Sequence, residues 1–191
     1  MSSSQSLKKG NISVLLTGNT GYVGSVVTRF LRNASYYVVG LDSNWFSNNY
    51  FFPIPEDSIP DKQIVKDIRE ITENDLGGID IVIHLAGLSN DPLGEINRLL
   101  TEEINYNATV RIAELSKKMG IERFIFASSC SIYGIAPTEL PINENARLNP
   151  LTAYSKAKVN SELHLAKLAD DNFHPIFMRN ATVYGLSPKL R

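Results

Sequence analysis

The chain has 191 residues, of which 43% are hydrophobic and 20% are charged, and its formal net charge at pH 7 is -1. This composition is typical of a globular protein with enough apolar material for one core, and the near-zero charge gives no reason to expect nucleic acid or an anionic membrane as a partner. Cys130 is the single cysteine, which excludes a disulfide framework and fits a reducing compartment, so we expect a cytoplasmic protein.

The first residues do not predict a targeting signal. The segment MSSSQSLKKG lacks the apolar stretch of a signal peptide, and no run approaches the roughly 18 consecutive apolar residues of a membrane span. We expect residues 1–10 to form a disordered arm and residues 11–191 to form one folded domain.

The folded part begins with a predicted strand, turn and helix. Residues 12–16 form an apolar run of strand length, and residues 22–31 carry apolar side chains at helical spacing. The turn between them has the glycine-rich sequence TGNTGYVG over residues 17–24. A second apolar run, residues 37–41, predicts the next strand and ends at Asp42.

A glycine-rich turn between a strand and a helix is typical of a dinucleotide site. Gly18 would permit the tight turn, Gly21 would let a pyrophosphate approach the backbone, and Gly24 would let the helix lie close to the strand. The helix N-terminus would offer unpaired N–H groups to the phosphates, and Asp42, about 20 residues on, would hold a ribose 2′-hydroxyl. A turn without a ligand is the alternative, but the strand, helix and acid together favour the dinucleotide site.

The stretch from residue 43 to 61 predicts a long irregular loop, and a loop of this length inside a compact domain is often functional. Its aromatic side chains could cover the adenosine end of a cofactor, face a second subunit, or form a local cluster that holds the loop to the core. These side chains are Trp45, Phe46, Tyr50, Phe51 and Phe52.

The remainder of the chain alternates strands with helices. Strands are predicted at residues 63–66, 79–85, 123–127 and 175–178, and helices at 96–119 and 152–169. This alternation indicates an α/β fold with a parallel, doubly wound sheet. Such sheets bind ligands beyond the carboxyl ends of their strands, and the residues at those ends include Asp67, Ala86, Gly87 and the polar cluster 128–131.

Tyr154 and Lys158 lie four residues apart on the last predicted helix, so their side chains share a face. A tyrosine titrates near 10, too high for a base at neutral pH, but an adjacent ammonium favours the phenolate. The pair could therefore transfer a proton, with a hydroxyl of cluster 128–131 bound to the reacting oxygen. The alternatives are a solvated helix face with one packed aromatic, and serines that only cap a helix or turn.

Together these motifs resemble the extended short-chain dehydrogenase/reductase family, especially its NAD-dependent nucleotide-sugar epimerases and dehydratases. Further segments that carry the resemblance are HLAG at 84–87, NYNAT around Asn105, SSCSIYG at 128–134, YSKAK at 154–158 and MRNATVYG at 178–185. The resemblance implies a Rossmann-type NAD-binding fold without a metal site. The implied NAD-binding residues are Gly18, Gly21, Tyr22, Val23, Gly24, Asp42, Asp67, Ile68, Leu85, Ala86, Gly87, Asn105, Ser128, Tyr154 and Lys158.

By this resemblance three residues would be catalytic. Tyr154 would remove a proton from a sugar hydroxyl as hydride passes to NAD, Lys158 would hold the cofactor ribose and lower the tyrosine pKa, and Ser129 would orient the oxygen. In an epimerase the transient keto sugar turns over and takes the hydride back on its other face. The implied function is an NAD-dependent epimerase of a nucleotide-linked sugar, and a reductase of the same superfamily acting on another carbonyl compound is an alternative.

Three positions depart from the pattern of the family. Family dehydratases tend to carry an acid at the position of Ser131, so the serine argues against elimination. Cys130 lies one residue from the place where some members have a cysteine acid/base, and we interpret it as a small packed side chain. Thr182 stands where many epimerases have an asparagine that contacts the sugar nucleotide.

Family members continue beyond the VYG turn into a lobe that builds most of the sugar-nucleotide pocket, whereas this sequence ends at Arg191. We therefore expect a chain that folds and binds NAD but turns over sugar nucleotides poorly, and a non-catalytic NAD-binding module is a further alternative. The predicted helices 96–119 and 152–169 correspond to those that the family pairs across a two-fold axis, so we expect a homodimer.

Overall fold

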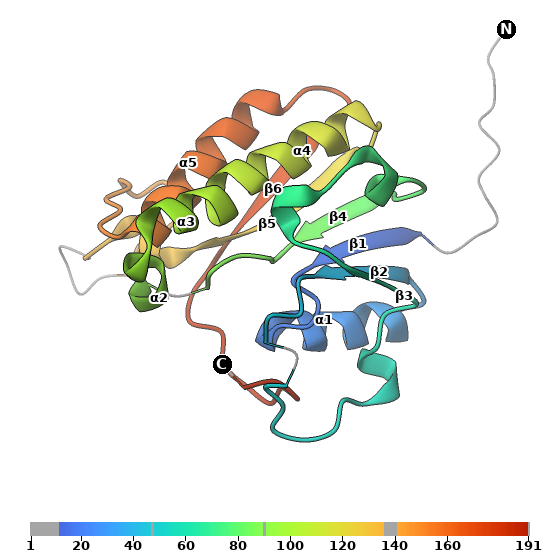
Figure 1. The fold of residues 1–191 in the computed structure, drawn as a ribbon. Coiled ribbons are helices and arrows are strands. Elements are labelled where there is room, and N and C mark those ends of the chain that lie inside the picture. The colour runs from blue at the N-terminus through green and yellow to red at the C-terminus, as the bar shows by residue number, and fades with distance from the viewer. Residues whose placement is uncertain (1–11, 47, 90, 136–140, 191) are drawn as a thin grey trace, which may run out of the picture.

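A computed structural model describes residues 12–46, 48–89, 91–135 and 141–190. These residues form a six-stranded parallel sheet with the strand order β3-β2-β1-β4-β5-β6 (Figure 1). The order reverses between β1 and β4, and an α/β sheet binds ligands in the crevice at such a switch point. The doubly wound α/β fold predicted from the sequence is confirmed, while the predicted arm, residues 1–10, lies outside the described residues.

The strands are β1 (Ser13–Thr17), β2 (Tyr37–Asp42), β3 (Lys62–Val65), β4 (Ile81–His84), β5 (Arg123–Ser129) and β6 (His174–Asn180). The α-helices are α1 (Tyr22–Asn33), α2 (Asp91–Ile96), α3 (Arg98–Glu102), α4 (Ala108–Lys118) and α5 (Ala153–Leu168), and a π-helical turn, Glu103–Asn107, joins α3 to α4. Short 3-10 helices lie at Glu56–Ser58, Ile68–Glu70, Glu73–Leu76 and Cys130–Tyr133. Among the helices within these described ranges, none combines the length and the hydropathy that a membrane-spanning helix needs.

Helices cover both faces of the sheet: α1 lies on one face, and α4 and α5 lie on the other (Figure 1). Side chains alternate between the two faces along a strand, so Leu15 of β1 belongs to the larger core cluster with Leu165 of α5. Its neighbours Val14 and Leu16 belong to the smaller cluster with Leu31 of α1. A strand buried on both faces is apolar throughout, which explains why β1 could be recognised from its uninterrupted apolar run.

The predicted helix 96–119 is in fact interrupted. Asn97 has an extended backbone, and its side-chain Oδ1 accepts a hydrogen bond from Leu100 N at 3.0 Å, so it ends α2 and caps α3. The π-helical turn that follows adds a residue and rotates the helical face. Leu99 of α3 is 75% exposed, whereas Ile104 and Ile112 are buried.

The strand β5 continues two residues beyond its predicted end. It pairs with β6 as far as the register pair of Ser129 with Asn180. Ser128 and Ser129 consequently lie within the strand and their side chains point to opposite faces of the sheet. Because their side chains lie on opposite faces, the two serines can bind different partners.

The long loop after β2 contacts the end of the described chain. Phe51 N donates to Pro188 O at 2.9 Å, and Leu190 N donates to Asn49 O at 3.1 Å. Lys189 is buried, with its Nζ 3.6 Å from the centroid of the Tyr50 ring. The loop aromatics are exposed rather than packed on the core, so the interpretation as a local cluster that holds the loop to the core is wrong. Backbone hydrogen bonds and the buried lysine hold it instead.

Candidate dinucleotide and active site

The glycine turn occupies the edge of the sheet between β1 and α1. Gly18 has a positive φ of 73°, and a Cβ there would lie 2.8 Å from Ala86 N of the next strand end. A Cβ on Gly24 would lie 2.0 Å from Gly18 O. Both positions therefore require glycine, the first for its backbone conformation and the second because the first turn of α1 packs directly on the glycine turn.

The outer side of this turn has the properties of a phosphate site. Around Gly21, the described residues place only Gly18 O within 4 Å of an added Cβ, at 3.3 Å. Gly21 caps α1 without a side-chain hydrogen bond, and the first turn of α1 contains no acid. The first N–H groups of a helix have no partner within the helix, so those that follow Gly21 are suited to bind an anion. The predicted Tyr22 and Val23 are the first residues of this helix.

Asp42 lies at the end of β2 beside the glycine turn. Its Oδ2 accepts a hydrogen bond from Thr20 N at 3.2 Å, and its Oδ1 accepts one from Asn44 N at 2.9 Å. These bonds hold the carboxylate between the turn and the loop after β2. This is the place in a Rossmann-type sheet where an acid reaches the adenosine ribose.

Asp67 has a structural function that the sequence did not predict. Its Oδ1 accepts from Arg69 N at 2.9 Å, and its Oδ2 accepts from the Arg69 guanidinium at 2.8 Å. The hydrogen bond with the Arg69 side chain lowers the pKa of Asp67. The neighbouring Ile68 is buried in the core. Any contact of Asp67 with a cofactor would be made by a carboxylate already paired with an arginine.

A buried chain of hydrogen bonds joins β1, β4 and the π-helical turn. Thr109 Oγ1 donates to Asn105 O at 2.9 Å, so it accepts from His84 Nε2 at 2.8 Å. His84 Nδ1 then accepts from Thr17 Oγ1 at 2.7 Å, and Thr17 Oγ1 accepts from Ala86 N at 3.2 Å. These directions assign the neutral imidazole with its proton on Nε2. Burial, followed by the charge of Lys158, lowers the pKa of His84 to about 3.

Asn105 fixes the segment that follows β4. Its Oδ1 accepts from Leu88 N at 2.8 Å, and its Nδ2 donates to Leu88 O at 2.9 Å. A Cβ on Gly87 would lie 2.9 Å from Asn105 Oδ1. Leu85, Ala86 and Gly87, the predicted nicotinamide-side residues, are thus positioned by Asn105 and by the chain through His84.

Tyr154 and Lys158 are brought together near the carboxyl end of β5. Lys158 is 5% exposed, and its Nζ lies 5.5 Å from the centroid of the Tyr154 ring. The same Nζ donates to Ala127 O of β5 at 2.6 Å. Burial lowers the pKa of Lys158 to about 8. The alternative of a solvated helix face is therefore wrong for the lysine.

The two serines at the end of β5 have different partners. Ser129 Oγ accepts from Ser131 N at 3.2 Å, which leaves the Ser129 hydroxyl proton able to donate. Ser128 Oγ donates to Glu162. Ser131 Oγ is buried and has no hydrogen-bond partner among the described residues. Of these hydroxyls, Ser129 best matches a group that orients a reacting oxygen.

Glu162 and Arg179 are two residues at this site whose roles were not predicted from the sequence. Glu162 of α5 is buried, and its Oε2 accepts from Arg179 Nη2 of β6 at 2.7 Å. The available signal was spacing, because Glu162 follows Lys158 by four residues, as Lys158 follows Tyr154. Arg179 belongs to a segment that carried the family resemblance, but its charge was given no role.

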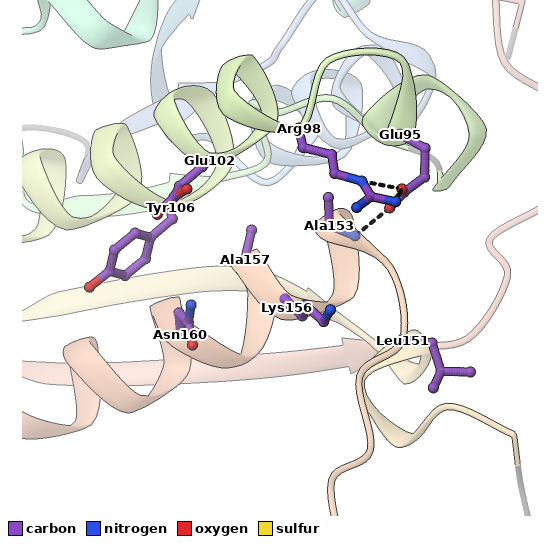
Figure 2. A pocket seen from close by; sticks show the side chains of 9 residues that line it. All are labelled: Glu95, Arg98, Glu102, Tyr106, Leu151, Ala153, Lys156, Ala157 and Asn160. Atoms are coloured by element: carbon purple, nitrogen blue, oxygen red, sulfur yellow. Dashed lines mark hydrogen bonds and ion pairs between the residues drawn. The ribbon is translucent and has the colours of Figure 1, made fainter.

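A surface pocket lies between the α2–α3 region and α5, and none of the predicted site residues lines it (Figure 2). Figure 2 shows Glu95 at its rim, where Oε2 accepts from Arg98 Nε at 2.6 Å and Oε1 accepts from Ala153 N at 2.6 Å. The remaining lining residues are Glu102, Tyr106, Leu151, Lys156, Ala157 and Asn160. No group of His, Cys, Asp and Glu side chains within the described ranges could hold a metal ion.

The structure thus has the features on which the sequence resemblance to short-chain dehydrogenases/reductases rests: a Rossmann-type sheet with a glycine turn, and a tyrosine and a buried lysine on α5 beside the carboxyl end of β5. Residues 14–190 match the model of the NAD dependent epimerase/dehydratase family, so the chain belongs to that family of NAD-dependent enzymes.

Relatives and solved structures agree with this assignment. The chain is 31% identical to the UDP-glucose 4-epimerase of Dictyostelium discoideum, in a match that covers 92% of this chain and 53% of the relative. It is 27% identical to the UDP-glucose 4-epimerase of Bacillus subtilis, in a match that covers 94% of this chain and 55% of the relative. It also resembles the structure of TunA, an NAD-dependent NDP-hexosamine 5,6-dehydratase, with a TM-score of 0.82 and 25% identity over 94% of this chain and 57% of that one. For the structure of MoeE5 in complex with UDP-glucose and NAD, the TM-score is 0.72 and the sequence identity is 29%. That match covers 86% of this chain and 52% of the MoeE5 chain. The chain spans about half the length of the curated relatives it matches.

Proposed function

We propose that this chain forms the NAD-binding part of an epimerase that acts on a nucleotide-linked sugar through a transient keto intermediate. The observation that carries the proposal is the Tyr154–Lys158 pair, which lies beside the carboxyl end of β5 with Lys158 bound to Ala127 O at 2.6 Å. The glycine turn and Asp42 would bind the phosphates and the adenosine ribose of the cofactor. UDP-glucose 4-epimerases among the relatives support a nucleotide sugar as the substrate class.

Each catalytic side chain has a distinct task in this proposal. Bound at these residues, NAD would supply the hydride chemistry, as an acceptor of the sugar hydride that can also give it back. Tyr154 accepts the hydroxyl proton in the first half of the reaction and gives it back in the second. Lys158 stabilises the phenolate and holds the cofactor ribose, and the free proton of Ser129 hydrogen-bonds the reacting oxygen.

The segment after β5 favours epimerisation over dehydration. Elimination of water needs a group that transfers a proton to the leaving hydroxyl. The 3-10 helix Cys130–Tyr133 that follows Ser129 contains no acid, and Ser131 occupies the position where dehydratases of the resembled family carry one. We therefore assign no elimination step to this chain.

We further propose a homodimer formed through the outer faces of α3, α4 and α5. Leu99 of α3 and Leu163 of α5 are exposed, and the pocket between the α2–α3 region and α5 carries both acidic and basic side chains (Figure 2). A face with both signs of charge can pair with a copy of itself across a two-fold axis. Light scattering at micromolar concentration should give the dimer mass. Leu163→Glu should give the monomer, whereas Val26→Glu, on the exposed side of α1, should not.

Cys130 is exposed, so its interpretation as a small packed side chain is wrong. We propose the cytoplasm as the compartment, supported by this free thiol.

The test of the proposed function combines binding and turnover. Calorimetry should detect NAD binding by the 191-residue chain, and a form that extends over the full length of its relatives should interconvert UDP-glucose and UDP-galactose without net production of NADH. Tyr154→Phe should abolish that turnover while NAD binding persists. Net NADH formation in proportion to product would identify an oxidoreductase instead and would contradict the proposal.

A further inference from the structure

A buried carboxylate lies one helical turn beyond Lys158. Glu162 is 4% exposed and shares the face of α5 that carries Tyr154 and Lys158. Burial of a carboxylate is costly unless hydrogen bonds or an opposite charge compensate it. The partners of Glu162 therefore indicate what this carboxylate holds in place.

The partners of Glu162 come from the ends of two neighbouring strands. Its Oε1 accepts from Ser128 Oγ and, at 3.1 Å, from Arg179 Nε, while its Oε2 accepts from Arg179 Nη2 at 2.7 Å. Ser128 and Arg179 face each other in the register of β5 and β6. Arg179 Nη1 also donates to the hydroxyl of Tyr133 at 2.9 Å. The carboxylate thus ties α5 to β5 and β6 at the level of the catalytic segment.

Charge balance around Lys158 depends on the same carboxylate. The titratable groups that face the lysine are Tyr154 and Glu162 from α5 and His84 from β4, and Arg179 of β6 lies behind Glu162. His84 is neutral, because burial lowers its pKa to about 3. Burial also lowers the pKa of Lys158 to about 8, and the charge of Glu162 opposes this effect. Without Glu162, the buried lysine would lose the one anion opposing its deprotonation among these groups.

We propose that Glu162 is a positioning residue for the Tyr154–Lys158 pair. Its carboxylate, held by Ser128 and Arg179, keeps the Lys158 side chain in the charged ammonium form that donates a hydrogen bond to Ala127 O. The inference rests on one part of the proposed function, namely that Lys158 stabilises the Tyr154 phenolate and holds the cofactor ribose. It adds a residue that contacts neither substrate nor cofactor but sets the charge of one that does.

The test is a titration of Lys158 in the folded chain. Lysine side-chain NMR with nitrogen-15, with the resonance assigned through Lys158→Arg, should give a lower titration midpoint in Glu162→Gln than in the wild type, by about one pH unit. Glu162→Asp, which retracts the charge by one methylene, should lower it less and serves if Glu162→Gln does not fold. Glu114→Gln is the matched control, because Glu114 is an exposed carboxylate on α4 paired with His164, and it should leave the midpoint unchanged.

An unmoved Lys158 midpoint in the folded Glu162 variants would overturn the inference and leave the proposed function intact. The affinity for NAD separates the two. At the pH of the wild-type Lys158 midpoint, a decrease of about one pH unit in that midpoint lowers the charged fraction about fivefold, so Glu162→Gln should bind NAD up to about fivefold more weakly there. A lowered midpoint with unchanged NAD affinity would support the inference and contradict the proposed contact of Lys158 with the cofactor.

Discussion

Replacement of Gly24 by alanine sets two effects of opposite sign against each other. Within an exposed helix, alanine is more favourable than glycine by about 1 kcal/mol. At this position, however, the added methyl would lie 2.0 Å from Gly18 O and 2.7 Å from Asn19 Cα. Both are backbone atoms, and Cβ atoms keep at least 3.0 Å from such neighbours, so the glycine turn must move by about 1 Å.

Overpacking of this kind costs about 1–3 kcal/mol, and a clash with backbone lies at the upper end. The net destabilisation is then about 2 kcal/mol, which for a chain of this size lowers Tm by about 4–8 °C. Thermal unfolding followed by circular dichroism measures this change. Because the turn that moves is the proposed phosphate site, calorimetry should also show at least tenfold weaker NAD binding.

Gly77→Ala is the matched control for this experiment. Gly77 has a negative φ of -61°, and a Cβ there would meet only Asn74 O at an ordinary 3.6 Å. The same chemical change should therefore leave stability equal or raise it by up to about 1 kcal/mol. A Gly24→Ala protein as stable as the wild type, with full NAD affinity, would refute the close packing of α1 on the glycine turn.

Three further predictions follow from the site. Asp42 should favour NAD over NADP, because its carboxylate would accept from a 2′-hydroxyl and repel a 2′-phosphate; equal or tighter NADP binding by calorimetry would contradict this. With serine at position 131, a form that extends over the full length of its relatives should give no 4-keto-6-deoxy product from nucleotide-linked hexoses. Detection of that product by mass spectrometry would assign the protein to the dehydratases instead. His84 binds its proton more weakly when folded, with a pKa of about 3 against 6.5, so the unfolded state holds more protons in this range. Its contribution to stability should therefore fall as the pH falls from 6.5 towards 3, by up to about 1.4 kcal/mol per pH unit, and urea titrations should lose this slope in His84→Gln.

The sheet and the glycine turn were predictable because they depend on local sequence. A strand buried on both faces must be apolar throughout, and a turn with a positive φ at Gly18 favours glycine. The interruption of the predicted helix 96–119 was less accessible. It depends on the side chain of Asn97 capping a new helix, and one polar residue on an amphipathic helix is no clear signal.

Contacts between side chains that lie far apart in the sequence were harder to predict than the local features. Tyr154 and Lys158 could be found because four-residue spacing on a helix brings side chains together. The partners of Glu162 are Ser128 and Arg179, which lie 34 and 17 residues away in sequence. Their proximity follows from the register of β5 with β6, which the sequence alone does not specify. The pairing of Arg69 with Asp67 is local by contrast, because the two residues lie 2 apart in sequence, and the family resemblance had assigned this carboxylate to the cofactor instead.

The most direct test of the account is a calorimetric titration of NAD into the 191-residue chain and its Gly24→Ala and Lys158→Met variants. We expect one NAD per chain for the wild type and clearly weaker binding for both variants, because Gly24→Ala distorts the phosphate turn and Lys158→Met removes the buried ammonium beside Tyr154. Gly77→Ala should bind like the wild type. No detectable binding by a folded wild-type chain, or equal binding by all four proteins, would contradict the dinucleotide site at this edge of the sheet.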